Sequence, residues 1–147
     1  MQQSYKSRIK VDISGIEELG KKVKKLKGDL FAILPEAVLA GADIVRDAAK
    51  DKARRKSGEL ADGIVSTITW DKKAPVAFAG AGVDKSKNAI FVKYDASGKR
   101  YYYPASIEYG HPKAPAYPFL RPAHEENRTK ARKEVRDRVK KLIEGVR

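Results

Sequence analysis

The stretch from Tyr102 to Ala123 constrains the fold of this chain more than any other, because it concentrates stiff and aromatic residues. It holds five of the seven prolines and four of the seven tyrosines in the 147-residue sequence. Each proline fixes φ and stiffens the backbone, and disordered linkers are poor in aromatic residues. The composition therefore predicts an ordered loop over residues 104–118, with Gly110 in a conformation that a Cβ would resist. Pro122 suits the first turn of a following helix.

The residues on either side of this loop show two different periods. After it, an apolar stripe at helical spacing predicts a last helix over about residues 119–146. Before it, β-branched and small residues predict strands at residues 64–70, 76–83, 90–94 and 100–103, with a turn at 71–75 and a hairpin loop at 95–99. The apolar stripe consists of Ala131, Val135, Val139, Leu142, Ile143 and Val146.

The N-terminal third predicts a strand followed by two helices. Residues 5–13 alternate as in a short strand, and Ser14 is placed as an N-cap with Glu17 in capping-box position. Helical spacing follows, and Gly28 and Asp29 break it. A second helix is expected over about residues 30–56, with a face of small residues that allows close packing against a sheet or another helix.

Together these patterns predict one domain of the α+β class. A small antiparallel sheet of three to five strands packs against a long helix, with basic N-terminal and C-terminal helices alongside. The expected order is a strand and helices over about residues 5–56, the sheet over about 60–103, the proline-rich loop over 104–118 and the last helix. A chain of 147 residues is typical of one domain.

The composition excludes several kinds of site. There is no cysteine, so disulfides, thiolate metal ligands and a cysteine nucleophile are ruled out. No run of about 18 apolar residues is present, which predicts no membrane span, and the N-terminus leads into no apolar signal segment. These features fit a reducing cytoplasm.

The net charge of +13 is densest at the two ends of the chain. Such a surface attracts nucleic acid, anionic lipid or an acidic protein face, and a simply solvated surface is the alternative. Lysines on the first helix and basic residues on the last one are candidates for lining a path for DNA. They are Lys21, Lys24, Lys25, Arg132, Arg136 and Lys140.

No pattern of catalytic or metal-binding residues is convincing. Glu108, His111, His124 and Glu125 could in principle bind a metal, but their spacing matches no compact ligand motif. Neither Ser57 nor Ser106 lies in a Gly-x-Ser-x-Gly turn, and nothing places Glu59 opposite Glu108 as a glycosidase pair. Gly80 and Gly82 lack the remainder of a nucleotide-binding fingerprint and are explained by close strand packing. Glu108 is expected to accept hydrogen bonds from the following turn or to pair with Arg121. We therefore expect no catalysis, no cofactor and no metal.

Three motifs, in order, resemble the HK97-type, gene-product-10-like family of phage neck or tail-completion proteins. They are KSGELADGI at residues 56–64, ASIEYG at 105–110 and PFLRPA at 118–123. The resemblance covers roughly Gly15 to the C-terminus. The chain departs from the family in lacking a proline shortly before Ser57 and in carrying His111 where threonine is common.

The resemblance implies a structural virion protein made in the bacterial cytoplasm and located at the head–tail interface. Such proteins form rings, commonly six-fold, around the channel that DNA crosses, and they contact head-connector and tail-tube or tail-terminator proteins. The loop would then supply contacts between subunits or rings, because aromatic and arginine side chains suit interfaces. The candidate contact residues are Glu108, Tyr109, Gly110, Tyr117, Phe119 and Arg121.

Two alternatives remain open at this stage. The first concerns Phe119, which together with Leu120 is expected to pin the last helix to the sheet rather than to contact a partner. The charge also fits a free nucleic-acid-binding module, although the chain carries no helix-turn-helix or RNA-binding signature.

Overall fold

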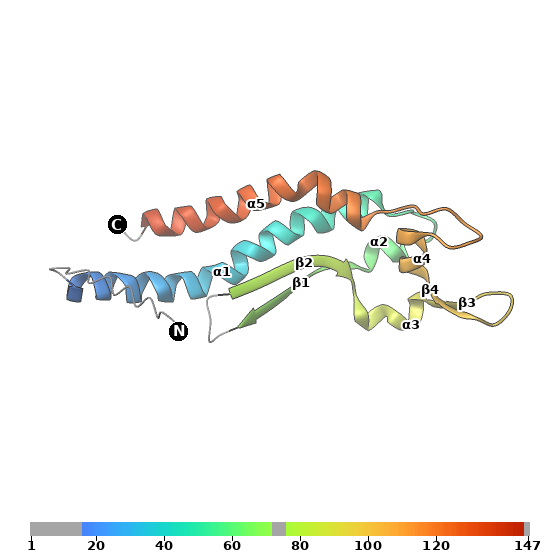
Figure 1. Cartoon of the computed structure of the whole chain (residues 1–147), viewed down its shortest axis with the longest axis horizontal. Coiled ribbons are helices and arrows are strands. Elements are labelled where there is room, and N and C mark those ends of the chain that lie inside the picture. The colour runs from blue at the N-terminus through green and yellow to red at the C-terminus, as the bar shows by residue number, and fades with distance from the viewer. Residues whose placement is uncertain (1–15, 72–75, 146–147) are drawn as a thin grey trace, which may run out of the picture.

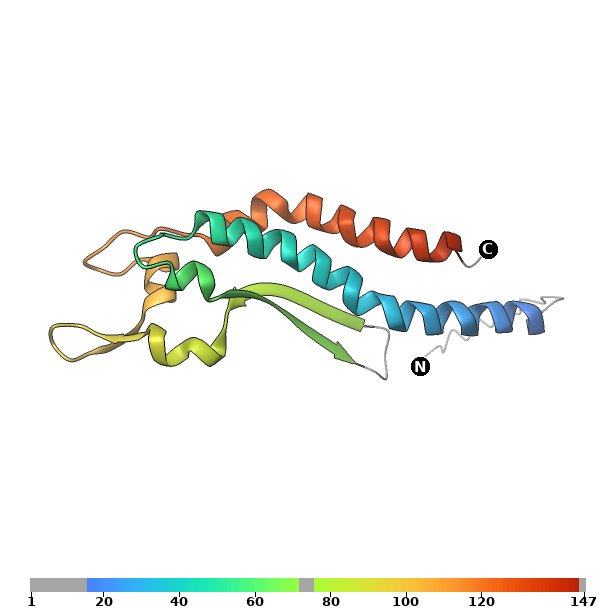
Figure 2. The same cartoon turned by 180° about the vertical axis from the view of Figure 1, so that it is seen from behind.

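A computed structural model of the chain describes residues 16–71 and 76–145. It is elongated, with two long helices side by side, a β-hairpin along the first of them and the smaller elements gathered at one end (Figures 1 and 2). This is the predicted α+β class, and no helix in the described ranges is long and apolar enough to cross a membrane. In chain order the elements are α1 (Ile16–Lys52), α2 (Glu59–Asp62), β1 (Ile64–Asp71), β2 (Val76–Val83), the 3-10 turn η1 (Lys85–Lys87), α3 (Asn88–Phe91), β3 (Val92–Tyr94), β4 (Arg100–Tyr102), α4 (Tyr103–Tyr109) and α5 (Leu120–Gly145).

Helix α1 corrects the prediction of two helices separated at Gly28, because it is continuous from Ile16 to Lys52. An interior glycine costs about 1 kcal/mol and an interior proline about 3 kcal/mol, and packing of the later turns against α5 and β1–β2 outweighs these costs. The helix changes direction along its course (Figure 1). Pro35 lies inside it, and proline is a common cause of such kinks. The helix also ends four residues earlier than the predicted Lys56. The strand predicted at residues 5–13 and the Ser14 cap lie outside the described residues.

Close contact between α1 and α5 explains the small-residue face of α1. A Cβ built on Gly41 would lie 2.7 Å from Val135 Cγ2 and 3.2 Å from the Ala131 carbonyl oxygen. Ala37, like Gly41, is buried. The glycine therefore lets two helix backbones approach, as the sequence predicts.

Strands β1 and β2 form the expected hairpin, with Ile64 paired to Val83 and Trp70 to Ala77. One face packs on α1, where the Ser66 hydroxyl donates a 2.6 Å hydrogen bond to Asp43. The four described strands do not form one sheet. They form two separate two-stranded antiparallel sheets, β1–β2 and β3–β4.

Two short helices occupy segments for which the sequence predicts strand or loop. Residues 88–91 form α3, which buries Phe91 at 2% exposure. The sequence predicts the end of a polar connection here and the beginning of a strand at 90–94. The first half of the predicted loop at 104–118 is α4, in which Pro104 occupies the first turn, where a missing N–H is harmless. The last helix, α5, agrees with its prediction within one residue at each end.

The core lies where α1, α5 and the smaller elements meet. Phe119 and Ile64 are fully buried there, beside Leu60 and Phe91. A Cβ on Gly63 would lie 2.6 Å from the Phe91 ring, so this glycine makes room for the aromatic side chain. The core thus anchors the start of α5 against the helix and hairpin layer, which fixes the position of the loop before α5.

Candidate subunit-contact site

Glu108 is the centre of the site, because its buried carboxylate ties α4 to the first turn of α5. Oε2 accepts hydrogen bonds from the backbone N–H groups of Phe119 (2.8 Å) and Leu120 (2.9 Å). Oε1 accepts from the backbone N–H of Arg121 (3.0 Å) and from its Nε (3.1 Å). These backbone donors are the ones that a helix start leaves unsatisfied, so Glu108 caps α5 from a different helix. Both roles expected from the sequence, turn acceptor and partner of Arg121, are present together.

The surroundings of Glu108 keep its carboxyl group ionised. Burial by itself raises the pKa, but the hydrogen bonds from Phe119, Leu120 and Arg121 outweigh it. The pKa of Glu108 therefore lies below its ordinary value of 4.5. A negative charge at the start of a helix is also favoured by the helix dipole.

A tight loop leads from Glu108 back to α5. Gly110 has φ 75° and ψ 178°, a region that only glycine occupies readily, and a Cβ there would lie 2.7 Å from Ala116 N. His111 and Ala114 exchange two backbone hydrogen bonds of 2.9 Å each. The N–H of Tyr117 donates to the Ile107 carbonyl at 2.7 Å. The predicted positive φ at Gly110 is confirmed, and the loop is held at both ends by backbone hydrogen bonds.

Two tyrosines on this segment are exposed, and an arginine covers each ring. Tyr109 is 70% exposed, and the Arg121 guanidinium carbon lies 5.3 Å from the centre of its ring. Tyr117 is 50% exposed, with the Arg54 guanidinium carbon 4.6 Å from its ring centre. Sequence reasoning missed Arg54, because the residue precedes α2 and nothing in the local pattern relates it to Tyr117.

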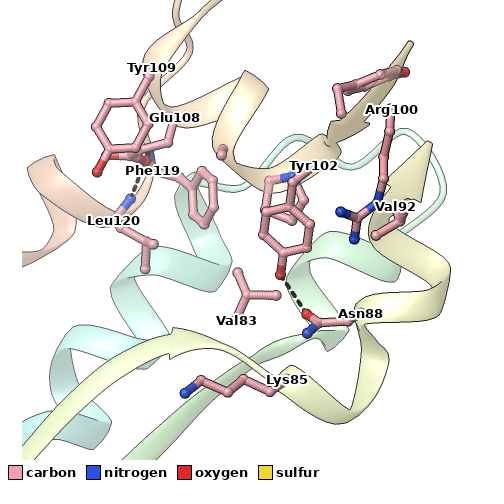
Figure 3. A pocket seen from close by; sticks show the side chains of 13 residues that line it. Val83, Lys85, Asn88, Val92, Arg100, Tyr102, Glu108, Tyr109, Phe119 and Leu120 are labelled. Atoms are coloured by element: carbon pink, nitrogen blue, oxygen red, sulfur yellow. Dashed lines mark hydrogen bonds between the residues drawn. The ribbon is translucent and has the colours of Figure 1, made fainter. Parts of the chain in front are cut away.

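A hollow of about 600 Å³ opens beside Glu108, between α4, β4 and the start of α5. Figure 3 shows the Tyr102 ring at this hollow, with its hydroxyl directed at Asn88, to which it donates a 3.2 Å hydrogen bond. Burial raises the pKa of the Tyr102 hydroxyl above its ordinary value of 10.0. Val83 and Phe119 also line the hollow, which makes its wall largely apolar.

The structure brings together only part of the predicted set of contact residues. Glu108, Tyr109, Gly110, Tyr117 and Arg121 form one cluster around the loop. Phe119 is 0% exposed and packs in the core, which matches the anchoring role and leaves no surface for a partner.

The predicted basic residues are exposed but lie apart from this loop. Lys21, Lys24 and Lys25 lie near the start of α1, and Lys140 near the end of α5, at the end of the molecule opposite α4 (Figure 1). Arg132 and Arg136 line a groove between α5 and β2.

The residues considered for catalysis or metal binding are dispersed or occupied. Within residues 16–71 and 76–145, no group of three or more His, Asp or Glu side chains is arranged to hold a metal ion. His111 lies in the tight loop, whereas His124 lines the groove beside β2. Glu59 is exposed at the start of α2, where the Ser57 hydroxyl donates to it at 3.1 Å. Glu108 already accepts four hydrogen bonds, so its oxygens are committed to capping α5.

Comparison with known proteins identifies a family. A family model described as "Bacteriophage HK97-gp10, putative tail-component" matches residues 17–110. No curated protein and no solved structure matches the chain. The matched region runs from α1 through α4 to Gly110, so it contains the β1–β2 and β3–β4 pairs, the short helices α2, α3 and α4, and Glu108 itself. The resemblance noted from the sequence motifs is therefore confirmed, and the chain belongs to the HK97-gp10-like family of bacteriophage tail components.

Proposed function

We propose that this chain is a neck or tail-completion subunit that forms a ring around the DNA channel. In this role it joins the tail tube or tail terminator to the head connector, with six subunits in the ring. Family membership supports the coarse role of a phage structural protein. The ring, its position and its contacts are the proposal.

The observation that carries the proposal is the pair of exposed tyrosines on the loop braced by Glu108. Tyr109 and Tyr117 offer large amphipathic surfaces, and each is covered by an arginine. Tyrosine and arginine are enriched among residues that dominate binding at protein interfaces. The backbone that carries them is held by the Glu108 cap and by the hydrogen bonds of the loop, so little conformational entropy is lost when a neighbour binds.

The distribution of charge along the molecule supports a ring around DNA. The segment from Tyr109 to Tyr117, called the tyrosine loop below, lies at one end, while the exposed lysines of α1 lie toward the other (Figures 1 and 2). In a ring, the first end can contact neighbouring proteins while the second faces the channel. Lysines there would neutralise passing phosphates without reading sequence.

A non-catalytic role is consistent with the use of Glu108. A general acid needs a carboxyl group that exchanges protons near the working pH, whereas Glu108 has a lowered pKa and four donors. The group is therefore suited to holding a helix start rather than to proton transfer.

The test is the mass of the purified protein in solution, measured by light scattering at moderate salt with and without short duplex DNA. The ring proposal expects an oligomer whose mass does not depend on DNA. Joint replacement Tyr109→Ala and Tyr117→Ala should then reduce the mass to that of smaller species. The control is Tyr94→Ala, which removes a 66% exposed tyrosine from β3 and should leave the mass unchanged.

A monomer that gains mass only with DNA would favour a free nucleic-acid-binding module instead. If the protein is a monomer in both conditions, the ring must form on its partners, and imaging of phage particles decides. Particles made with the double variant should then separate into filled heads and free tails. Normal particles with the double variant would contradict the proposal for these tyrosines.

A further inference from the structure

A second surface, far from the tyrosine loop, is a groove between β2 and α5 with a volume of about 610 Å³. Its floor is the small-residue face of α1, which includes Val38, Gly41 and Ala42. One wall is a single face of α5, and the other is β2. The proposed ring contacts do not use this groove.

The β2 wall is a strand edge rather than a sheet face. Five consecutive residues, 77–81, line the groove, although side chains along a strand alternate between its two faces. Residues whose side chains point to opposite faces of the strand can all line one groove only where the edge of the strand faces that groove. Within the described residues β2 pairs with β1 alone, so its other edge has unpaired backbone N–H and C=O groups. An unpaired edge of this kind is a template for another strand.

The α5 wall carries a row of arginines on successive turns. Arg128, Arg132 and Arg136 all line the groove and are exposed. In the described part of the chain, no carboxylate lies within ion-pairing distance of any of the three.

Three other basic side chains of α5 contrast with this row. Lys133, Arg138 and Lys140 each pair with an acidic residue one turn away, at 2.6, 2.8 and 3.7 Å. Charge on the rest of the helix is thus partly neutralised within the helix, whereas the groove face is left positive.

We propose that this groove binds an acidic, extended segment of another virion protein, which adds to β2 as a third strand. The backbone of the segment would pair with the free β2 edge, as in other cases of strand addition. Side chains on one of its faces would rest on the small residues of α1, and its carboxylates would pair with Arg128, Arg132 and Arg136. A protein ligand fits better than DNA, because a nucleic-acid backbone offers only acceptors to the strand edge and gains nothing from an apolar floor. A second copy of this chain fits poorly, because its net charge is +13.

The first probe is a blocked, labelled peptide of about nine residues in which glutamate alternates with valine or threonine. At a rise of roughly 3.3 Å per residue, a strand of this length can pair along the eight residues of β2. We expect it to bind, as measured by fluorescence anisotropy. Joint replacement of Arg128, Arg132 and Arg136 by glutamine should weaken binding roughly tenfold, because three exposed ion pairs are lost together. The matched control replaces Lys130, Lys133 and Lys140 by glutamine, which changes the net charge equally and should have little effect.

Two further measurements separate strand addition from general charge attraction. A peptide of the same charge with pairs of adjacent prolines should bind weakly, because successive residues direct their N–H groups to opposite edges of a strand, so each pair removes a donor from the edge that faces β2. Binding of the first peptide should also slow amide hydrogen exchange within residues 77–81.

Several outcomes would overturn the proposal. The proposal fails if the peptide does not bind, or if the arginine and lysine triple variants lose the same amount of affinity. It also fails if the proline peptide binds as tightly as the first peptide, or if amide hydrogen exchange in β2 is unchanged on binding. Duplex DNA of the same charge that binds as well as the peptide, with the same dependence on the three arginines, would assign the row to nucleic acid. None of these readouts depends on ring formation, so failure here and failure of the proposed function are distinguishable.

Discussion

Replacing Glu108 by glutamine should destabilise the fold by about 3 kcal/mol at neutral pH, because it removes the charge from a cap that accepts four hydrogen bonds. The glutamine oxygen can keep some of these donors, but its NH₂ group would face the others. Hydrogen bonds to a charged group contribute about 1.5–3 kcal/mol each, so losing one or two gives this magnitude. The Arg121 side chain is 56% exposed, so its pairing contributes little and the backbone donors dominate.

The pH dependence gives this prediction a second, independent signature. The pKa of Glu108 is lowered in the folded state, from an ordinary value of 4.5. Its contribution is therefore fully present above the unfolded-state pKa and is lost as the pH falls through the folded-state pKa. The difference in stability between the two proteins should be full near neutrality and shrink as the pH falls below about 4.5.

Urea unfolding followed by circular dichroism measures both effects, and thermal unfolding should show a loss of about 10 °C in Tm for a chain of this size. The control is Glu125→Gln, which removes an exposed charge from the start of α5 without touching the cap. A loss for Glu108→Gln no larger than for this control would refute the reasoning. So would a loss that stays constant between neutral and strongly acidic pH, since it would show that charge is not what the cap provides.

Three other changes test the packing that positions the site, each by urea unfolding. Gly41→Leu should lower the free energy of unfolding by about 2–3 kcal/mol by pushing α1 from α5. Gly28→Leu, with nothing within 4 Å, should be neutral or stabilising, and equal losses of stability in the two variants would contradict the close contact. Gly110→Ala should cost about 3 kcal/mol because strain and contact with Ala116 add, whereas Gly98→Ala, with φ 78° and open surroundings, should cost about 1 kcal/mol; reversal of that order would be inconsistent with the loop geometry. Phe119→Ala should cost about 3–5 kcal/mol, and a loss below about 1 kcal/mol would show that this ring does not anchor α5.

The fold class and several elements could be predicted from local pattern alone. Strands β1 and β2 follow from a run of β-branched residues and from a run of small ones, and α5 follows from an apolar stripe at helical spacing. Both signals are local properties of the sequence, namely residue type for the strands and the spacing of apolar residues for the helix. They can therefore be recognised without knowledge of tertiary contacts. Gly110 was predictable for a similar reason, because tolerance of a positive φ is a property of glycine itself and the surrounding prolines and aromatic residues indicate a tight, ordered loop.

The errors occurred where tertiary contacts overrode local preference. Gly28 and Asp29 predict an interruption, yet α1 continues through them and through Pro35, since its later turns gain packing against α5 and the hairpin. Residues 88–91 read as the approach to a strand and its first residues but form a helical turn, which places Phe91 in the core beside Gly63. Local propensities amount to about 1 kcal/mol per residue, so burial of one large side chain can outweigh them.

The sequence by itself determined which residues were available for the site, and the family motifs already pointed to the segment between α4 and α5. The sequence left two roles open for Glu108, as hydrogen-bond acceptor for the following turn or as partner of Arg121, and only the tertiary structure decided that it has both. Glu108 and Arg121 are separated by a loop, and whether that carboxylate caps α5 depends on where two helices meet in space. Tyr117 and Arg54 come from distant parts of the chain, as do β2 and the arginines of α5. Such pairings are set by the packing of whole elements, which no local pattern encodes.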